Sequence, residues 1–573
     1  MKSNKLALAV ISAAALCLSA CNDNAGKNNQ QAATRSHAEH AAKTPGQYFK
    51  PEQVTTQGSV TVEGNRVDYT AVAGTLVVHP KGWDDVPGAT QSEQAPAQPG
   101  AGSEESGKPQ GNPTAEASMF YVAYFKKGAA PSTRPITFLY NGGPGSATIW
   151  LHMGAFGPRR IRTSDDTHTP PAPYDLVNND YSLLDASDLV FIDAPGTGFS
   201  RIAGKEKDKA FYGVDQDAHA FAEFITEFLS KYNRWNSPKF LFGESYGTTR
   251  SALLANLLTT EYDTDLNGVI LLSQILNFDL SVDGAQRNPG VDLPYALALP
   301  TYAATAWYHH KVAGAPADLE AFLKQAEQFS MTEYLPALEA GAALDPGRRQ
   351  QVIAKLAQYT GLSPDYLNKA NMRVNGGEFE KNLLGDSDET TGRLDTRFAG
   401  PTLDPLSEGA EYDPQAAAIS SAYVSAFNTY VRQSLKYGMD KTYKPSNNVF
   451  RSWDRKHQQP HSQFSIEQTP NVMPDLANAM KYDPNLKVLL NAGYYDLATP
   501  FFEGIYEMQH LPMPQKLQAN ISFRFYQSGH MVYAHEPALK ALHDNTAEFI
   551  RANSGGSPAA SSGAGSAPAA PGQ

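Results

Sequence analysis

The chain has 573 residues, of which 41% are hydrophobic and 10% aromatic, and its formal net charge is −12. This length accommodates a large core with an inserted subdomain, and the composition is that of a globular protein. The negative charge argues against nucleic acid as a partner, because phosphate binding requires a basic surface. No function follows from the charge itself.

The first residues are typical of a bacterial export signal. Two lysines precede an apolar run from Leu6 to Leu18, which is too short to span a bilayer. The run ends in Leu18-Ser19-Ala20-Cys21, which resembles the lipobox in which the cysteine becomes the lipidated first residue. We therefore expect a lipoprotein signal peptide over 1–20 and lipidation at Cys21. The alternative is an ordinary signal peptide with an incidental cysteine.

The expected location follows from this anchor. Asn22 stands where an aspartate is associated with retention in the inner membrane of some bacteria. We expect an exported protein, lipid-anchored in a bacterial membrane, with the outer membrane facing the periplasm as the default.

Composition changes along the chain predict its organisation. Polar, aperiodic or Gly/Pro/Ser-rich segments separate stretches that contain strand-like and helix-like patterns. The predicted parts are a flexible tether (21–45), the N-terminal part of a core (46–279) with a low-complexity insertion (84–117), a helical cap (280–445), the C-terminal part of the core (446–553) and a disordered tail (554–573).

Short apolar runs alternate with helix-length stretches, which predicts an α/β fold with a mostly parallel sheet buried on both faces. The runs are rich in β-branched and aromatic residues. They cover 74–78, 119–124, 136–140, 189–192, 240–242, 269–272, 488–490 and 521–525. Helical patterns such as ADLEAFLKQAEQF and GRRQQVIAKLAQYTGL lie within 280–445, and we interpret them as a cap inserted over the site.

The run 240–242 leads into Gly243-Glu244-Ser245-Tyr246-Gly247, which has the form G-x-S-x-G and precedes a helix-compatible stretch. A strand, a sharp turn and a helix would expose the Ser245 hydroxyl above the sheet, and side chains at the two glycines would clash. The pentapeptide alone is weak evidence for a nucleophile, so the rest of the sequence has to supply a base, an acid and an oxyanion site.

Two later strand ends supply the acid and the base. Asp496 follows 488–490, and His530 follows 521–525. Open α/β sheets place their chemistry at the carboxyl ends of strands, and the order Ser245, Asp496, His530 is that of α/β-hydrolases. Taken singly, Asp496 could cap a helix and His530 could be a turn histidine.

A glycine-rich loop, Asn141-Gly142-Gly143-Pro144-Gly145, follows the run 136–140. One of its N–H groups, with that of Tyr246, could hold a developing oxyanion. The loop could also be a simple turn. A phosphate-binding loop is disfavoured, because the helix-opening Lys-Ser/Thr is missing.

Five ordered motifs, NGGPG, DAPGTGFS, GESYG, GYYD and GHMV, resemble those of the serine carboxypeptidase family (peptidase family S10), over roughly 118–275 and 446–550. The resemblance implies an α/β-hydrolase fold with a helical cap and an acyl-enzyme mechanism that releases C-terminal amino acids. Ser245 would then be the nucleophile, His530 the base and Asp496 its orienting acid. The resemblance further implies that the N–H groups of Gly143 and Tyr246 form the oxyanion hole and that Asn141 and Glu244 recognise the substrate's C-terminal carboxylate.

The chain departs from this family at the carboxylate site. Many members carry a second glutamate two residues before Gly-Pro, and this chain has Ala155 there. We hypothesise that Arg159 or Arg160 replaces the carboxyl by direct charge pairing, which would move the pH optimum toward neutral. The alternative is that both arginines are solvated surface residues.

Two loops also differ from the family pattern. The loop that begins at Asp193 is one residue shorter than usual and ends in Arg201, so the side-chain preference cannot be carried over. The usual Gly-Asn-Gly after the sixth predicted strand, 269–272, is replaced by Ser273-Gln274-Ile275-Leu276-Asn277.

The leading hypothesis is a lipid-anchored serine carboxypeptidase that acts on peptides and needs no cofactor or metal. An esterase or acyltransferase with the same triad is a second reading, and a non-catalytic surface binding protein is a third. The acidic run 386–389 lacks the spaced ligands and glycine of a calcium loop, so we expect a solvated loop there. The oligomeric state is not predicted.

Overall fold

The computed structural model describes residues 48–85, 112–314 and 316–555. These residues belong to one compact unit, Pro45–Gln573. The predicted signal peptide with Cys21, the predicted tether and most of the predicted insertion and tail lie outside the described residues.

A ten-stranded sheet forms the core, in the order β1-β2-β3-β7-β4-β9-β10-β13-β14, and β8 also pairs with β3. All neighbours from β7 to β14 are parallel, whereas β1, β2, β3 and β8 pair antiparallel. The strands are β1 (Gln53–Val62), β2 (Asn65–Val78), β3 (Glu116–Lys126), β4 (Ile136–Tyr140), β7 (Asp188–Ile192), β8 (Arg201–Ala203), β9 (Lys239–Glu244), β10 (Gly268–Leu272), β13 (Lys487–Gly493) and β14 (Ile521–Tyr526). Two small ribbons pair β5 (Arg159–Ile161) with β6 (Leu176–Asn178) and β11 (Glu389–Thr391) with β12 (Ala399–Pro401).

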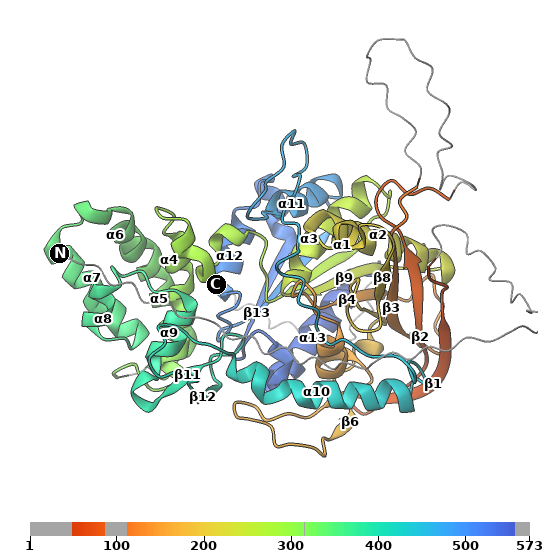
Figure 1. Cartoon of the computed structure of the whole chain (residues 1–573), viewed down its shortest axis with the longest axis horizontal. Helices are drawn as coiled ribbons and strands as arrows, with labels where there is room; N and C mark the ends of the chain where they lie inside the picture. The colour runs from red at the N-terminus through yellow and green to blue at the C-terminus, as the bar shows by residue number, and fades with distance from the viewer. Residues whose placement is uncertain (1–47, 86–111, 315, 556–573) are drawn as a thin grey trace, which may run out of the picture. The chain divides into compact units, whose positions relative to one another are not determined.

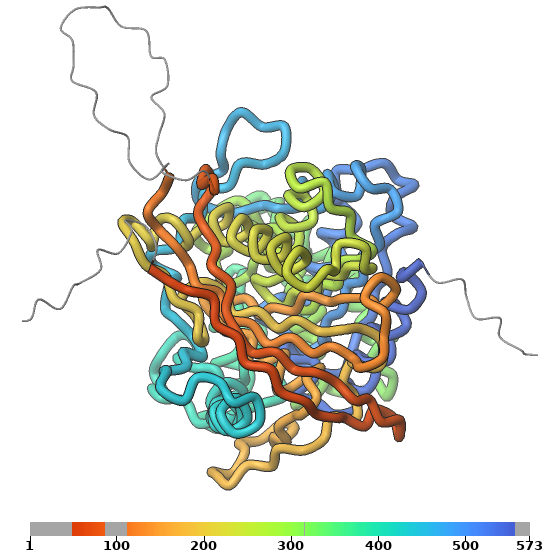
Figure 2. Tube along the Cα trace, turned by 90° about the vertical axis from the view of Figure 1, so that its right-hand side faces the viewer, coloured from red at the N-terminus to blue at the C-terminus, as the bar shows by residue number. Residues whose placement is uncertain are grey.

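All eight predicted apolar runs are strands of this sheet, which confirms the predicted α/β class. The central strands β4, β7 and β10 are buried along their whole length, as parallel strands covered on both faces require. The prediction missed β1, and Figure 2 shows β1 and β2 in red as a long hairpin at the edge of the sheet. The predicted insertion extends too far, because β3 begins at Glu116 and its first residues are buried.

Helices cover both faces of the sheet. One buried apolar cluster joins α2, α3 and α11 to one face, and a second joins η1, α10 and α13 to the other. These helices are α2 (Val214–Lys231), α3 (Tyr246–Thr260), α11 (Met473–Tyr482), η1 (Leu151–Phe156), α10 (Pro414–Gln433) and α13 (Glu536–Ala552), and α1 (Lys207–Phe211) precedes α2.

The segment predicted as a cap contains a group of helices that Figure 1 shows gathered beside α12. Their apolar side chains belong to the same buried cluster as α2 and α3, so the cap shares the core rather than enclosing its own. The helices are α4 (Leu293–Tyr308), α5 (Leu319–Phe329), α6 (Leu335–Glu339), α7 (Pro346–Thr360), α8 (Pro364–Lys369) and α9 (Gly376–Leu383), and α4 packs against α12 (Phe501–Gln509). The two helical patterns quoted above correspond to α5 and α7.

The last helix of the predicted cap, α10, departs from the rest of it. Its buried side chains pack with η1 and α13 on the opposite face of the sheet.

Within the described ranges, no helix is both long enough and apolar enough to cross a membrane.

Candidate active site

Ser245 occupies a strained turn between β9 and α3. Its φ of 61° and ψ of −131° fall in a region that side chains rarely adopt, as expected of a nucleophile elbow. A Cβ at Gly243 would lie 2.1 Å from the Gly247 carbonyl oxygen, and one at Gly247 would lie 2.8 Å from the Tyr140 carbonyl oxygen. The predicted need for two glycines is thus confirmed. The Ser245 side chain is half-buried.

Asp496 and His530 form a buried pair. His530 Nδ1 lies 2.8 Å from Asp496 Oδ2, and the two side chains are 5% and 0% exposed. Burial lowers the pKa of His530, but the charge and hydrogen bond of Asp496 outweigh burial and leave the pKa above its ordinary value. Asp496 does not cap a helix: its carboxylate accepts hydrogen bonds from the N–H and the hydroxyl of Thr499, and α12 begins only at Phe501.

Backbone hydrogen bonds align the serine with this pair. Ser245 N–H donates to the Leu272 carbonyl at the end of β10, and Ser273 N–H donates to the Asn491 carbonyl on β13. The Ser273 hydroxyl donates to the His530 carbonyl at 2.7 Å. The Ser245 hydroxyl has no hydrogen-bond partner among the described residues. The strand ends therefore hold the backbones of Ser245 and His530 at one edge of the sheet, and catalytic hydrogen bonds between side chains often tighten only when substrate binds.

A strap, defined here as residues 393–397, joins the predicted cap to the loops that carry Asp496 and His530. His530 N–H donates to the Leu394 carbonyl at 2.6 Å, and Leu497 N–H donates to the Arg393 carbonyl at 3.1 Å. The buried Asp395 accepts from the Gly529 N–H at 3.2 Å and pairs with Arg397 at 2.7 Å. The strap thus fixes the backbone on which the imidazole is carried.

The two predicted oxyanion donors line one cavity of about 560 Å³. A Cβ at Gly142 would lie 2.4 Å from the Tyr246 nitrogen, so the glycine-rich loop approaches the start of α3 as closely as a backbone can. Gly143 has a φ of 109°, and both Gly143 and Tyr246 border the cavity. The arrangement can therefore present backbone N–H groups to an oxygen that develops negative charge beside Ser245.

The side chains around the rest of this cavity include aromatic groups and charged groups of both signs, because Asp279 and Asp283 line it together with arginines. Phe278, Phe450 and Trp453 supply apolar walls, and Arg287 and Arg455 lie among them. Ile275, from the loop that replaces the family's Gly-Asn-Gly, also borders it. Glu507 of α12 holds this loop by accepting the N–H groups of Leu276 and Asn277.

Asn141 and Glu244 are joined directly, next to the predicted triad. Asn141 Nδ2 donates to Glu244 Oε2 at 2.8 Å, and each residue is 3% exposed. The Tyr533 hydroxyl donates to the same carboxylate, at 2.9 Å from Oε2. Burial is the main cause that raises the pKa of Glu244 to about 7, against the lowering influence of His530 and these two hydrogen bonds.

Neither arginine near Ala155 contacts this pair. Arg160 is buried and its guanidinium is 2.5 Å from Glu536, whereas Arg159 is exposed on β5. The hypothesis that one of them replaces the missing carboxyl therefore has no support in these contacts, and the alternative of solvated arginines describes only Arg159.

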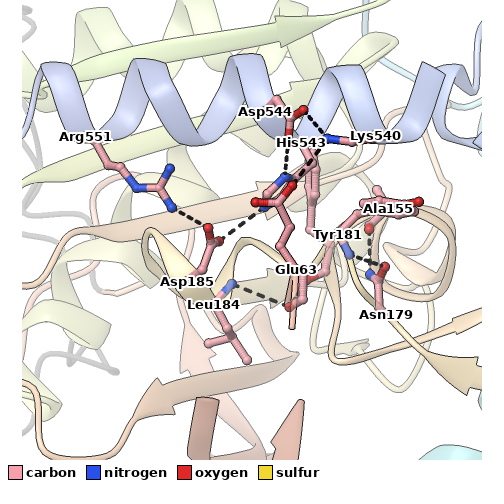
Figure 3. A network of polar contacts seen from close by, with 12 residues as sticks. Glu63, Ala155, Asn179, Tyr181, Leu184, Asp185, Lys540, His543, Asp544 and Arg551 are labelled. Carbon is pink, nitrogen blue, oxygen red and sulfur yellow. Dashed lines mark hydrogen bonds and ion pairs between the residues drawn. The ribbon is translucent and has the colours of Figure 1, made fainter. Parts of the chain in front are cut away.

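Position 155 is held by its backbone. The carbonyl of Ala155 accepts a hydrogen bond from Asn179 Nδ2 at 2.7 Å, and the methyl group is fully buried. Figure 3 shows this contact beside a polar network in which His543 of α13 lies between Asp185 and Asp544. The network ties α13 to the neighbouring loop and adds no carboxyl to the Asn141–Glu244 pair.

The loop that begins at Asp193 has a structural part in the fold. Asp193 is buried and accepts the Thr148 N–H at 2.8 Å, and burial is the main cause that raises its pKa to about 7. The Arg201 guanidinium donates hydrogen bonds to the carbonyl groups of Gly198 and Ser200 in its own loop.

In the described part of the chain, no group of three or more His, Cys, Asp or Glu side chains is placed to hold a metal ion. The acidic run 386–389 is a surface turn that leads into β11.

Sequence reasoning missed three contributors to this site: Thr499, Tyr533 and the strap. Thr499 and Tyr533 each lie three residues after a predicted site residue, so a scan of the positions that follow Asp496 and His530 could have found them. The strap carries no local signal, because it meets the catalytic loops from more than 100 residues away.

Comparisons with known proteins agree with the motifs. The family model described as serine carboxypeptidase matches residues 96–536, which is more than half of the chain. The chain belongs to the serine carboxypeptidase family. Relatives include "Serine carboxypeptidase S10 family member 1" of Dictyostelium discoideum, 30% identical over 146 residues, and "Pheromone-processing carboxypeptidase KEX1" of Phytophthora infestans, 30% identical over 141 residues.

These alignments cover only part of each protein. They span 24% and 22% of this chain and 30% and 21% of the two relatives. "Serine carboxypeptidase-like 36" of Arabidopsis thaliana is 26% identical, over 29% of this chain and 34% of its own length. The solved structure of Kex1(delta)p, a prohormone-processing carboxypeptidase from Saccharomyces cerevisiae, is similar with a TM-score of 0.48 and 14% identity, over 84% of this chain and 91% of that one.

Proposed function

We propose that this chain is a serine-type carboxypeptidase that releases C-terminal amino acids from peptides through an acyl-enzyme intermediate. The observation that carries the proposal is the buried His530–Asp496 pair at 2.8 Å, set at the same edge of the sheet as the strained Ser245. Membership of the serine carboxypeptidase family supports the choice of reaction.

In this mechanism the Ser245 hydroxyl attacks the scissile carbonyl while His530 Nε2 accepts its proton. Asp496, bonded to Nδ1, fixes the tautomer and stabilises the imidazolium. The N–H groups of Gly143 and Tyr246 hold the tetrahedral oxyanion. His530 then protonates the departing amino group, and a water molecule, activated by the same imidazole, hydrolyses the acyl-serine.

Specificity for a free C-terminus is assigned to Asn141 and Glu244. A carboxyl that is buried and has a pKa of about 7 is largely protonated in mild acid, so it can donate a hydrogen bond to a substrate carboxylate instead of repelling it. The Asn141 amide, whose Nδ2 donates to Glu244, would contact the same substrate carboxylate.

Ala155 favours a second candidate, an esterase or acyltransferase with the same triad. The family's second carboxyl is absent and no arginine replaces it, so a substrate without a free carboxylate is chemically acceptable. A non-catalytic binding protein is disfavoured, because binding alone has no use for a strained serine beside a buried Asp–His pair.

For the N-terminus we propose export, lipidation at Cys21 and attachment to the outer membrane facing the periplasm. The lipobox-like Leu18-Ser19-Ala20-Cys21 supports this proposal. Metabolic labelling with an alkynyl fatty acid tests it: the wild type should be labelled and Cys21→Ser should not. Separation of the inner and outer membranes then locates the labelled protein.

The activity is tested on a soluble form that lacks residues 1–21, with Ser245→Ala as control. Blocked dipeptides with a free C-terminal carboxylate are compared with the matching amides and esters from pH 4 to 8. Serine-dependent release of the terminal amino acid from the free acids, with the amides much slower, is expected. Cleavage of esters alone would establish the second candidate. Labelling by a fluorophosphonate that Ser245→Ala retains would refute the assignment of the nucleophile.

A further inference from the structure

A phenol hydroxyl is built into the Asn141–Glu244 pair. Tyr533 lies in η9 (Val532–Ala534), three residues after His530, and is 3% exposed. Its hydroxyl is 2.9 Å from Glu244 Oε2 and 3.1 Å from Oε1. Glu244 immediately precedes Ser245, so the turn that follows His530 brings a phenol to the residue next to Ser245.

The phenol reaches Glu244 from the side of the missing carboxyl. A Cβ placed on Gly154, the neighbour of Ala155, would lie 2.6 Å and 2.7 Å from two ring carbons of Tyr533. The Tyr533 ring therefore packs against the backbone of Gly154, the residue before the position where many members of the family carry their second glutamate, and it shares a buried cluster with Ala155. The Tyr423 hydroxyl meets the same point, at 2.5 Å from that Cβ.

The contacts also assign a part to each oxygen of Glu244. Oε2 accepts from Asn141 at 2.8 Å and from Tyr533 at 2.9 Å, while Oε1 has only the longer contact with Tyr533. Asn141 is itself fixed, since its Oδ1 accepts the Leu151 N–H at 3.1 Å. Two donors on Oε2 leave Oε1 as the oxygen on which a proton of the carboxyl would lie.

We propose that Tyr533 is the positioning residue of the carboxylate site: it stands in for the absent second carboxyl and orients Glu244 to bind the C-terminal carboxylate of the substrate. The inference rests on the proposed carboxypeptidase function. In this role, the Tyr533 hydroxyl makes recognition of a free carboxylate compatible with Ala155.

Replacing a carboxyl by a phenol changes how the site responds to pH. A pair of carboxyls loses its shared proton as pH rises, whereas Tyr533 remains a donor, because burial is the main cause that raises its pKa well above the ordinary value. The ionisable groups that face Glu244 are His530, Asp496, Tyr533 and Tyr423. The Tyr533 hydrogen bond favours the charged form of Glu244, so removing it should raise the pKa of Glu244 further.

The experiment compares the wild type, Tyr533→Phe and Tyr526→Phe in the form that lacks residues 1–21, on a blocked dipeptide and its methyl ester, from pH 5 to 9. Tyr526→Phe is a matched control, because it removes another buried phenol hydroxyl, which bonds Asn491 instead of Glu244. In Tyr533→Phe, kcat/KM for the free acid should fall about ten-fold at pH 6, through KM, and kcat/KM for the ester should change less than two-fold. The pH above which KM for the free acid rises should also move upward.

The outcomes separate this inference from the proposed function. A wild type that does not prefer the free acid over the ester refutes the carboxypeptidase assignment, and with it the inference. A wild type with that preference and a Tyr533→Phe variant with unchanged KM for the free acid refutes the inference alone. Equal losses of kcat on both substrates would also overturn it, since the phenol would then act on the triad. Thermal melting of each variant verifies that it is folded.

Discussion

His457 ties a loop that lines the cavity beside Gly143 and Tyr246 to two helices, and its removal should change how stability depends on pH. Its Nδ1 lies 2.7 Å from Asp215 and its Nε2 lies 2.8 Å from Asp475. Asp215 is in the first turn of α2, Asp475 is in α11, and the loop that bears His457 also contributes Trp453 and Arg455 to the cavity. The two ring nitrogens of the imidazolium therefore connect this loop to α2 and to α11 through one carboxylate each.

The size of the effect follows from the pKa. Burial lowers the pKa of His457, but the hydrogen bonds to both aspartates outweigh it and raise the pKa from 6.5 to about 9. Burial raises the pKa of Asp475, whereas the second partner, Asp215, is half exposed and therefore keeps its carboxylate in contact with solvent. A pKa displaced by this amount contributes about 3 kcal/mol. Because the folded pKa is raised, this stability is complete below pH 6.5 and is lost as pH rises through about 9.

The assay is urea unfolding of the form that lacks residues 1–21, at pH 6, 7, 8 and 9.5, for the wild type, His457→Gln and His461→Gln. His461 is a matched control on the same loop, because its ring bonds the Asn478 amide and no carboxylate. The free-energy difference between the wild type and His457→Gln should shrink by about 3 kcal/mol from pH 6 to 9.5. A difference that stays constant with pH would refute the reasoning, since the contribution would then not come from charge.

Three further predictions concern the elbow, the acid and the strap. Gly247→Ala brings a Cβ to 2.8 Å from the Tyr140 carbonyl oxygen and should lower kcat at least ten-fold while the melting temperature falls; a fully active, equally stable variant would contradict the packing. Asp496→Asn should lower kcat for ester substrates by about 10⁴-fold with little change in KM, which steady-state kinetics will measure. Asp395→Ala removes the acceptor of the Gly529 N–H and should lower kcat about ten-fold at constant KM; a change in KM alone would show that the strap does not position His530.

The sequence predicted the parts of the fold whose cause is local. Continuous apolar runs such as 136–140 and 269–272 correspond to β4 and β10, because a strand buried on both faces needs apolar side chains at every position. By contrast, β1 was missed because most of its residues are polar. It lies at the edge of the sheet, and in its first half exposed positions alternate with half-buried ones. The first residues of β3, Glu116 and Ala117, were assigned to the low-complexity segment, because its composition extends up to them.

The same distinction explains the site. The sequence itself shows where strands end and in which order motifs follow one another. This is why it could predict Ser245, Asp496 and His530. A scan of the positions after His530 could have found Tyr533, but its contact with Glu244 spans 289 residues and has no local signal. Asp395 could not be predicted, because it reaches Gly529 across 134 residues. Such contacts depend on how distant loops come together in the fold, and no local sequence pattern indicates this arrangement.

The strap has a consequence for the exchange of parts between relatives. A graft of the segment 280–445 from another member would appear to replace only the walls that select a substrate. It would also replace the carbonyl of Leu394, on which the His530 N–H is anchored at 2.6 Å. Part of the cavity wall and the anchor of the His530 backbone are therefore encoded in one stretch of sequence in this chain. A chimera that keeps the native residues 393–397 should recover turnover that a full graft loses.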